Sequence, residues 1–171
     1  SKSTGNVIDP ITMTDRYGAD ALRMALVWGA NVDNDISLSE NNVRGMRNLA
    51  NKIWNAARFV QQSEFKSQKS KVKIDIELNK ITKLVTNHLE KFRLNQAAEL
   101  IYDKFWHWYC DEIIEKAKNG KVRKEDLRYG LEVFLKLLHP FMPFVTEAVW
   151  RELGFREQLI LQPWPGLQPR E

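Results

Sequence analysis

The residues best suited to chemistry lie in one segment, between positions 41 and 59. Polar and basic side chains recur there every three or four residues, and one aromatic ring stands among them. The set comprises Asn41, Arg44, Asn48, Lys52, Asn55, Arg58 and Phe59. Lys and Arg bind phosphates, Asn reads base edges, and an exposed aromatic ring stacks on an unpaired base. This combination is typical of a surface that binds single-stranded nucleic acid.

A helix is needed to bring these residues onto one side. Ser39 precedes the segment Glu40–Gln62 and is expected to cap it as a helix. At about 100° per residue, an apolar arc forms one side of that helix. The arc contains Val43, Met46, Leu49, Ala50, Ile53, Trp54, Ala57 and Val60. The polar and basic set lies on or beside the opposite face.

Two interpretations of Phe59 stay open. The ring lies about 160° from Val43 on the helical wheel, so the apolar arc is complete without it. In the first interpretation the ring stacks on a base. In the second it packs beneath the Lys-rich segment that follows the helix, or against a neighbouring helix.

No pattern in the sequence predicts a catalytic or metal centre. The three histidines are scattered, and the single cysteine, Cys110, can form no internal disulfide and no recognisable zinc site. His107 and His139 have no nucleophile or carboxylate partner at an interpretable spacing, so we expect core or capping roles for both. Cys110 is expected to be an inert buried thiol.

Composition narrows the class of protein. The chain has 171 residues, 43% apolar and 28% charged, which fits one soluble globular domain. Its net charge of +4 permits a polyanionic partner without requiring one. No apolar run approaches the roughly 18 residues that span a bilayer, and the single cysteine favours a cytoplasmic setting. Six Trp, eight Phe and four Tyr indicate either a bulky core or rings that face a ligand.

Helix breakers cluster near the two ends, so the middle of the chain is predicted to be helical. Further helices are expected over 21–28, where Asp20 is the cap, and over 77–92, 95–118, 124–138 and 140–153. Ile160 and Leu161 are expected to form a short extended piece. The expected fold class is all-α, a helical bundle with irregular N- and C-terminal segments.

Several longer motifs occur along the chain. The first ten residues read SKSTGNVIDP, RYGADALR follows at 16–23, and positions 47–60 read RNLANKIWNAARFV. Others are NQAA at 95–98, FW at 105–106, YCD at 109–111, LHPFMPFVTE at 138–147 and QPWP at 162–165. Together they resemble class I aminoacyl-tRNA synthetases of the valine, isoleucine and leucine group, most closely those for valine. The resemblance covers nearly the whole chain.

This resemblance implies a role for the first residues. Ser1, Lys2 and Ser3 are similar to the end of the K-M-S-K-S signature, an ATP-binding loop in which Lys2 would stabilise the ATP phosphates electrostatically. The H-I-G-H signature, the amino-acid pocket and the editing domain would lie upstream of this sequence. ATP and valine are therefore expected to be substrates of the full-length enzyme, while this chain alone has no cofactor or metal. We expect it to form no aminoacyl-adenylate.

The resemblance also implies a division of the chain and a partner. Residues 1–30 would connect to the catalytic domain, 31–156 would form the helical anticodon-binding domain, and 157–171 would be an extended tail. The expected partner is the anticodon stem-loop of tRNA(Val), bound by the seven residues between 41 and 59. Asn41 is neutral at a position where a basic side chain would contact the tRNA. Arg44 is therefore expected to make that contact in its place.

Three alternatives stay open. The first is that the chain is the same domain of an isoleucine enzyme, which shares the opening motif and the His-Pro-Phe corner. A synthetase-derived module that binds a protein would use an apolar groove in place of a cationic stripe. A protein that binds unrelated single-stranded RNA would show no preference for an anticodon.

Overall fold

The computed structural model describes residues 9–28, 38–62 and 72–166, and these residues contain helices and no strand. The elements are α1 (Pro10–Tyr17), α2 (Ala19–Val27), α3 (Glu40–Gln62), α4 (Ile74–Glu90), α5 (Leu94–Asp103), the π-helix η2 (Lys104–Ile113), α6 (Ile114–Lys118), α7 (Lys124–Leu138), α8 (Pro143–Glu152) and the 3-10 turn η3 (Leu159–Leu161). The expected all-α fold class is confirmed.

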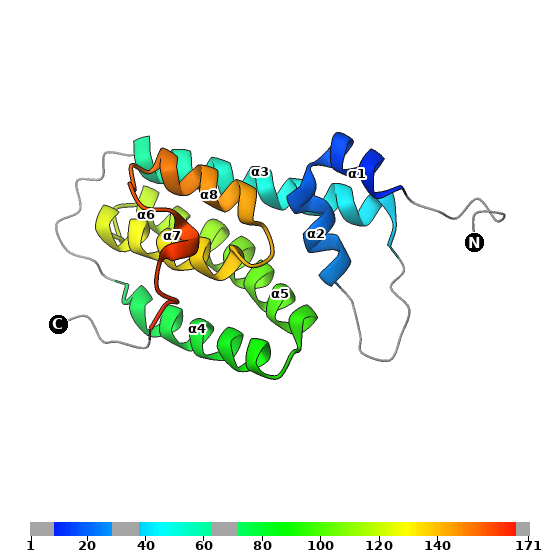
Figure 1. The fold of residues 1–171 in the computed structure, drawn as a ribbon. Helices are drawn as coiled ribbons and strands as arrows, with labels where there is room; N and C mark the ends of the chain where they lie inside the picture. The colour runs from blue at the N-terminus through cyan, green and yellow to red at the C-terminus, as the bar shows by residue number, and fades with distance from the viewer. Residues whose placement is uncertain (1–8, 29–37, 63–71, 167–171) are drawn as a thin grey trace.

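Helix α3 runs along much of the bundle, and the other elements pack around it (Figure 1). Helices α1 and α2 pack on its N-terminal half, and α8, α7 and η2 contact it further along. Helices α4 and α5 pack against each other and against α7. The buried side chains of these elements form one continuous apolar core.

The predicted boundaries of α3 are confirmed, and so is most of its core face. Ser39 caps the helix, because its Oγ accepts the backbone N–H of Asn42 at 3.1 Å. The buried residues are Val43, Met46, Leu49, Ile53, Ala56, Ala57 and Val60. Placing Trp54 within this face was wrong, since 38% of its surface is exposed. The buried arc runs from Ala56 to Val43 and is centred near Ile53, so Trp54 falls just beyond its edge.

The N-terminal segment is more regular than predicted. Asp9 caps α1 by accepting the backbone N–H groups of Ile11 at 3.3 Å and Thr12 at 3.0 Å. Pro10 occupies the first helical position, where a missing N–H costs nothing. An Asp-Pro pair is a helix-start signal, so this helix was predictable from the sequence.

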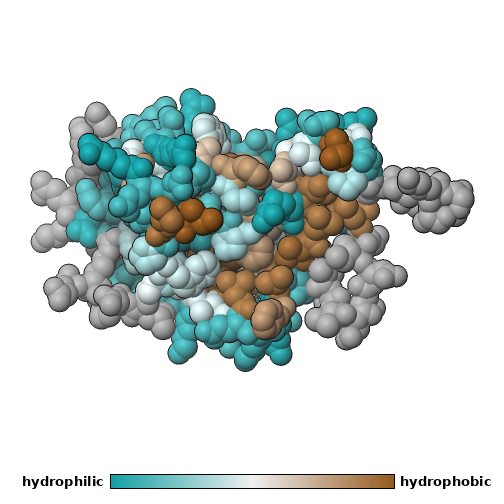
Figure 2. All heavy atoms as spheres, in the orientation of Figure 1, coloured by the Kyte–Doolittle hydropathy of each residue, from teal (hydrophilic) through white to brown (hydrophobic). Residues whose placement is uncertain are grey.

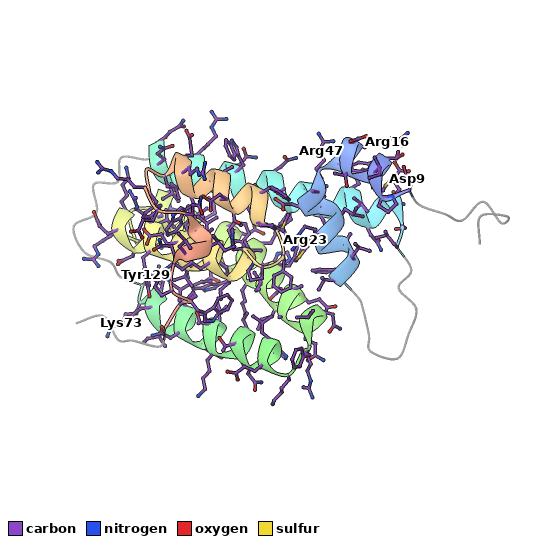
Figure 3. All side chains as sticks on the ribbon, viewed as in Figure 1. Asp9, Arg16, Arg23, Arg47, Lys73 and Tyr129 are labelled. Carbon is purple, nitrogen blue, oxygen red and sulfur yellow. The ribbon has the colours of Figure 1, made fainter. Side chains whose placement is uncertain are left out.

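Asp20 caps a different helix from the one predicted. Its carboxylate accepts the N–H groups of Phe144 at 3.1 Å and Val145 at 2.6 Å, at the N-terminus of α8. The guanidinium of Arg23, which Figure 3 labels, donates to the carbonyl oxygens of Phe141 at 3.3 Å and Pro140 at 3.1 Å. These contacts tie α2 to the corner between α7 and α8.

The aromatic residues of η2 mainly fill the core. Phe105 and Tyr109 are fully buried, and both rings pack on Phe134 of α7 with centroids 5.5 and 5.4 Å apart. The Tyr109 hydroxyl donates to the carbonyl oxygen of Leu127 at 2.7 Å. Gly130 makes room for the same ring, because a Cβ there would lie 2.8 Å from Tyr109 Cε2. For these rings the bulky-core interpretation is confirmed.

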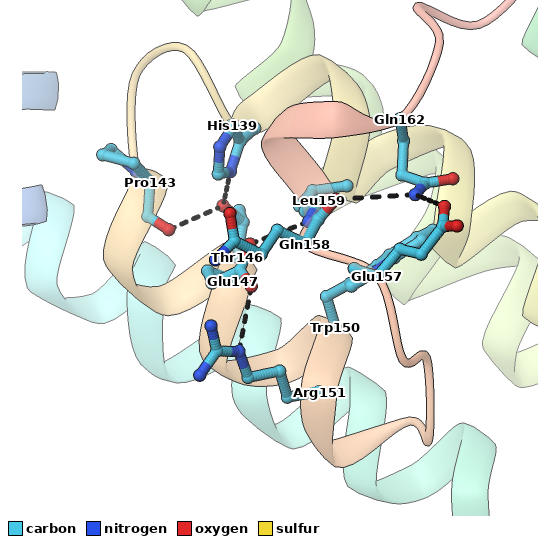
Figure 4. Close-up of polar contacts among 10 residues, drawn as sticks. All are labelled: His139, Pro143, Thr146, Glu147, Trp150, Arg151, Glu157, Gln158, Leu159 and Gln162. Carbon is cyan, nitrogen blue, oxygen red and sulfur yellow. Dashed lines mark hydrogen bonds and ion pairs between the residues drawn. The ribbon is translucent and has the colours of Figure 1, made fainter.

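Residues 157–159 are anchored on α8 (Figure 4). Glu147 accepts Nε of Arg151 at 3.0 Å and the backbone N–H of Leu159 at 2.8 Å. Trp150 donates its indole N–H to the carbonyl oxygen of Glu157 at 2.9 Å. The predicted extended piece at residues 160–161 was wrong, because these residues belong to the turn η3.

Candidate nucleic-acid interface

Five of the seven predicted contact residues are exposed together on α3. They are Asn41, Arg44, Asn48, Asn55 and Arg58. The guanidinium of Arg44 donates to the amide oxygen of Asn41 at 3.0 Å, which joins a charged donor to the neutral residue one turn earlier. Asn48 and Asn55 lie about two turns apart, at the spacing that puts two side chains on one face. The structure therefore presents donors suited to phosphates and amides suited to base edges.

Lys52 is engaged within the bundle. Its ammonium group lies 2.9 Å from Asp111 Oδ1 and 4.7 Å from the ring centroid of Trp106, both on η2. Only 30% of the Lys52 side chain is exposed. The bond to Lys52 is the main reason that the pKa of Asp111 lies below its usual value. A phosphate contact by Lys52 would have to replace this ion pair, so that role stays a prediction.

Phe59 lies at the boundary between the core and the exposed face. The ring is half-buried and packs against the core, in line with the second of the two interpretations. The ammonium group of Lys118 lies 5.4 Å from its ring centroid. Stacking of Phe59 on a base stays a prediction, and the structure adds packing as a second role for the same ring.

Lys118 is a neighbour of the site that the sequence did not predict. It is the last residue of α6, and its ammonium group lies 2.6 Å from Glu115 Oε1. Lys118 and Phe59 are brought together only by the packing of the helical run 94–118 beside α3. No local pattern links two residues so far apart in sequence, so no sequence signal could have identified the pair.

Of the other residues considered for chemistry, Cys110 and His139 have structural surroundings. The expected core or capping role of His107 was wrong, because 64% of its side chain is exposed and its Nδ1 lies 3.4 Å from Asp111 Oδ2. Burial raises the pKa of the Cys110 thiol to about 12, as expected for an inert thiol. His139 Nδ1 lies 2.8 Å from Oγ1 of Thr146, and this hydroxyl lies 2.8 Å from the carbonyl oxygen of Met142. Burial lowers the pKa of His139. The predicted capping role suits this histidine, which joins the end of α7 to the start of α8.

Some predictions fall outside the part of the chain that the structure describes. Ser1, Lys2 and Ser3 lie there, so their arrangement as an ATP-binding loop stays a prediction. Among the described residues, no cluster of three or more His, Cys, Asp or Glu side chains is placed to hold a metal ion. None of the helices in the described ranges combines the length and apolar character that crossing a membrane requires.

An apolar region lies away from the exposed face of α3 that carries the predicted contact residues. Two adjoining cavities, of about 450 and 520 Å³, share His139, Pro143 and Ile160 in their walls. The side chain of Ile160 is 69% exposed. Figure 2 shows this region, with one hydrophobic patch over η3 and a larger one over α2 and α5.

Comparison with known proteins decides the family. A family model described as the anticodon-binding domain of tRNA ligase matches residues 72–171. The chain belongs to this family. A second family model, that of class I tRNA synthetases for I, L, M and V, matches residues 1–39. The resemblance to class I aminoacyl-tRNA synthetases is confirmed.

Relatives of this anticodon-binding domain carry the name valine–tRNA ligase. The protein of Bradyrhizobium diazoefficiens is 40% identical over an aligned length of 191 residues, and the alignment covers all of this chain and 20% of that protein. The protein of Clostridium tetani is 39% identical over an aligned length of 186 residues, and the alignment covers 96% of this chain and 21% of that protein. The chain thus spans about a fifth of the length of these curated relatives.

A solved structure supports the same fold assignment. The ternary complex of Agrobacterium radiobacter agnB2 LeuRS with tRNA and LeuAMS contains a chain that matches with a TM-score of 0.76 and 25% identity. The match covers 98% of this chain and 22% of that one. The helical arrangement described above is therefore that of a class I synthetase.

Proposed function

We propose that this domain binds the anticodon stem-loop of tRNA(Val) through the exposed face of α3. The observation that carries the proposal is the set of cationic and amide side chains on that face, in a chain of the anticodon-binding family. The preference for valine rests on the names of the relatives, which are valine–tRNA ligases. Neither of these relatives supports the tRNA for isoleucine as the partner.

Each type of side chain has a distinct task in this proposal. Arg44 and Arg58 bind backbone phosphates, which supplies affinity that depends on salt. Asn48 and Asn55 each offer an amide that donates and accepts, and so discriminate between base edges. The exposed part of the Phe59 ring stacks on an unpaired base. Phosphate contacts thus hold the loop while amides and the ring select its sequence.

The activity of the whole protein is a further part of the proposal. We infer that the full-length protein ligates valine to tRNA(Val) and uses ATP as a substrate. Lys2 would then stabilise the ATP phosphates as part of the K-M-S-K-S loop. Such an enzyme works in the cytoplasm, where tRNA is charged. The 171-residue chain alone would form no aminoacyl-adenylate, because Lys2 by itself cannot position ATP and valine together.

The experiment that tests the interface compares two arginine variants. Arg58→Ala should weaken binding of a valine anticodon stem-loop and lower the log–log salt slope by roughly 0.7–0.9. Arg156→Ala is the matched control, because Arg156 is also exposed but lies beyond α8. Equal effects of the two substitutions would mean that only net charge matters, and the α3 interface would be rejected.

A second candidate function, binding of a protein partner, is supported by the two cavities beside His139. An apolar groove is what a protein-binding module would use, and Ile160 lines both cavities. Ile160→Arg would abolish capture of a protein partner, whereas Leu161→Arg, next to it and 72% exposed, would not. Stem-loop binding that is unchanged by Ile160→Arg would place RNA recognition elsewhere, as the first proposal requires.

A further inference from the structure

The ring of Phe59 and the ammonium group of Lys118 form an unusual surface pair. The ammonium lies 5.4 Å from the ring centroid, within the range of a cation–π contact. The same ammonium lies 2.6 Å from a carboxylate oxygen of Glu115. About half of each side chain of this ion pair is exposed, 48% for Lys118 and 54% for Glu115. The cation over the ring is therefore in contact with solvent and with whatever approaches the ring.

An ammonium group over a ring occupies a position that a stacked base would need. A base that stacks on this side of Phe59 must displace Lys118. The displacement costs little, because a cation–π contact and an ion pair are both weak when exposed. The displaced ammonium remains attached to α6, next to the ring, where the phosphates that flank an unstacked base would lie.

We propose that Lys118 is a further RNA-contacting residue, which covers the Phe59 ring in the free protein and moves to a phosphate when a base stacks there. The inference rests on the proposed function, since it requires a base on Phe59. Glu115 holds the lysine in place in the free protein and releases it to the stronger negative charge of the RNA backbone. An unpaired base followed by a phosphate within reach of α6 is thus recognised by two residues that act in turn.

The test is a double-mutant cycle on stem-loop binding with Lys118→Met and Phe59→Ala. Methionine keeps an apolar stem of similar length and removes the ammonium. Lys116→Met is the matched control, because Lys116 lies two residues away on α6 and forms a comparable ion pair with Glu112. Affinity is measured by fluorescence anisotropy with a labelled valine anticodon stem-loop, over a series of salt concentrations.

Two results are expected. Lys118→Met lowers the log–log salt slope by about 0.7, so its deficit relative to the wild type shrinks as salt rises. Phe59→Ala weakens binding about two- to five-fold more in the Lys118→Met background than in the wild type, because the ring no longer has a competing cation to lose. Lys116→Met leaves the cost of Phe59→Ala unchanged.

The outcomes separate this inference from the function beneath it. If Lys118→Met and Lys116→Met behave alike while Arg58→Ala still weakens binding, the assignment of Lys118 is overturned and the interface stands. If the wild type does not distinguish the stem-loop from a duplex of equal length, the proposed function fails and the inference fails with it. An equal cost of Phe59→Ala in both backgrounds shows that Lys118 does not cover the ring.

Discussion

The contact between Asp20 and the N-terminus of α8 allows a worked prediction of stability. The carboxylate is buried, with 6% of the residue exposed, and accepts two backbone N–H groups. Asp20→Ala removes both bonds. Both bonds lie in part-buried surroundings. The bond to Val145 is the shorter, at 2.6 Å, and its loss should dominate the cost.

The magnitude follows from three effects. An unsatisfied N–H costs about 1–3 kcal/mol, and removal of a negative charge from a helix N-terminus costs about 0.3–1 kcal/mol more. Burial is the largest influence on the carboxylate and raises the pKa of Asp20, so the substitution also relieves a desolvation cost. The net loss of unfolding free energy should be about 2 kcal/mol. Asp20→Asn keeps one acceptor oxygen and should lose about half as much.

Urea denaturation followed by circular dichroism measures these losses. Asp15→Ala is the control, because Asp15 is exposed on the neighbouring helix α1 and its loss should change stability by less than about 0.5 kcal/mol. An m-value equal to that of the wild type shows that the variants unfold the same core. If Asp20→Ala is as stable as Asp15→Ala, the α2–α8 contact does not stabilise the fold and the reasoning is refuted.

Three further predictions concern pH, packing and salt. Because burial lowers the pKa of His139, the unfolded chain takes up a proton near 6.5 before the folded protein does. The stability that neutral His139 contributes is therefore present above pH 6.5 and is lost as pH falls through the folded pKa. Urea titrations at several pH values should show a weaker pH dependence of stability for His139→Gln than for the wild type. Gly130→Ala should cost about 1–3 kcal/mol in the same assay by overpacking against Tyr109; an unchanged midpoint would mean that the ring moves freely. Lys52→Ala should lower the salt slope of stem-loop binding by about 0.7–0.9, as the loss of a phosphate contact requires; an unchanged slope would show that Asp111, 2.9 Å away, keeps the ammonium from the RNA.

Local patterns predicted the helices that carry a strong apolar period. The boundaries of α3 and of α7, Lys124–Leu138, are those expected from the sequence. The start of α8 was placed at Pro140, whereas the structure begins it at Pro143. The local sequence, with two prolines and a histidine, gave no reason to start the helix at Pro143 and not at Pro140. The start is fixed by Asp20, more than 120 residues away, which accepts the first N–H groups of α8.

The candidate interface was predictable only in part. Helical geometry identified the exposed face of α3, including Asn48, Asn55 and Arg58, because exposure follows from angular position. It could not identify the partners of Lys52 and Phe59. Those partners lie on η2 and α6, and which side chains meet there depends on how the helical run 94–118 packs beside α3.

The most direct test of the account is titration of the chain with anticodon stem-loops of valine tRNA and isoleucine tRNA, at low and high salt. The account predicts tighter binding of the valine stem-loop at both salt concentrations, with both affinities falling as salt rises because Arg44 and Arg58 displace counterions. A valine stem-loop that binds no more tightly than one with a scrambled loop, at either salt concentration, would contradict anticodon recognition by this domain.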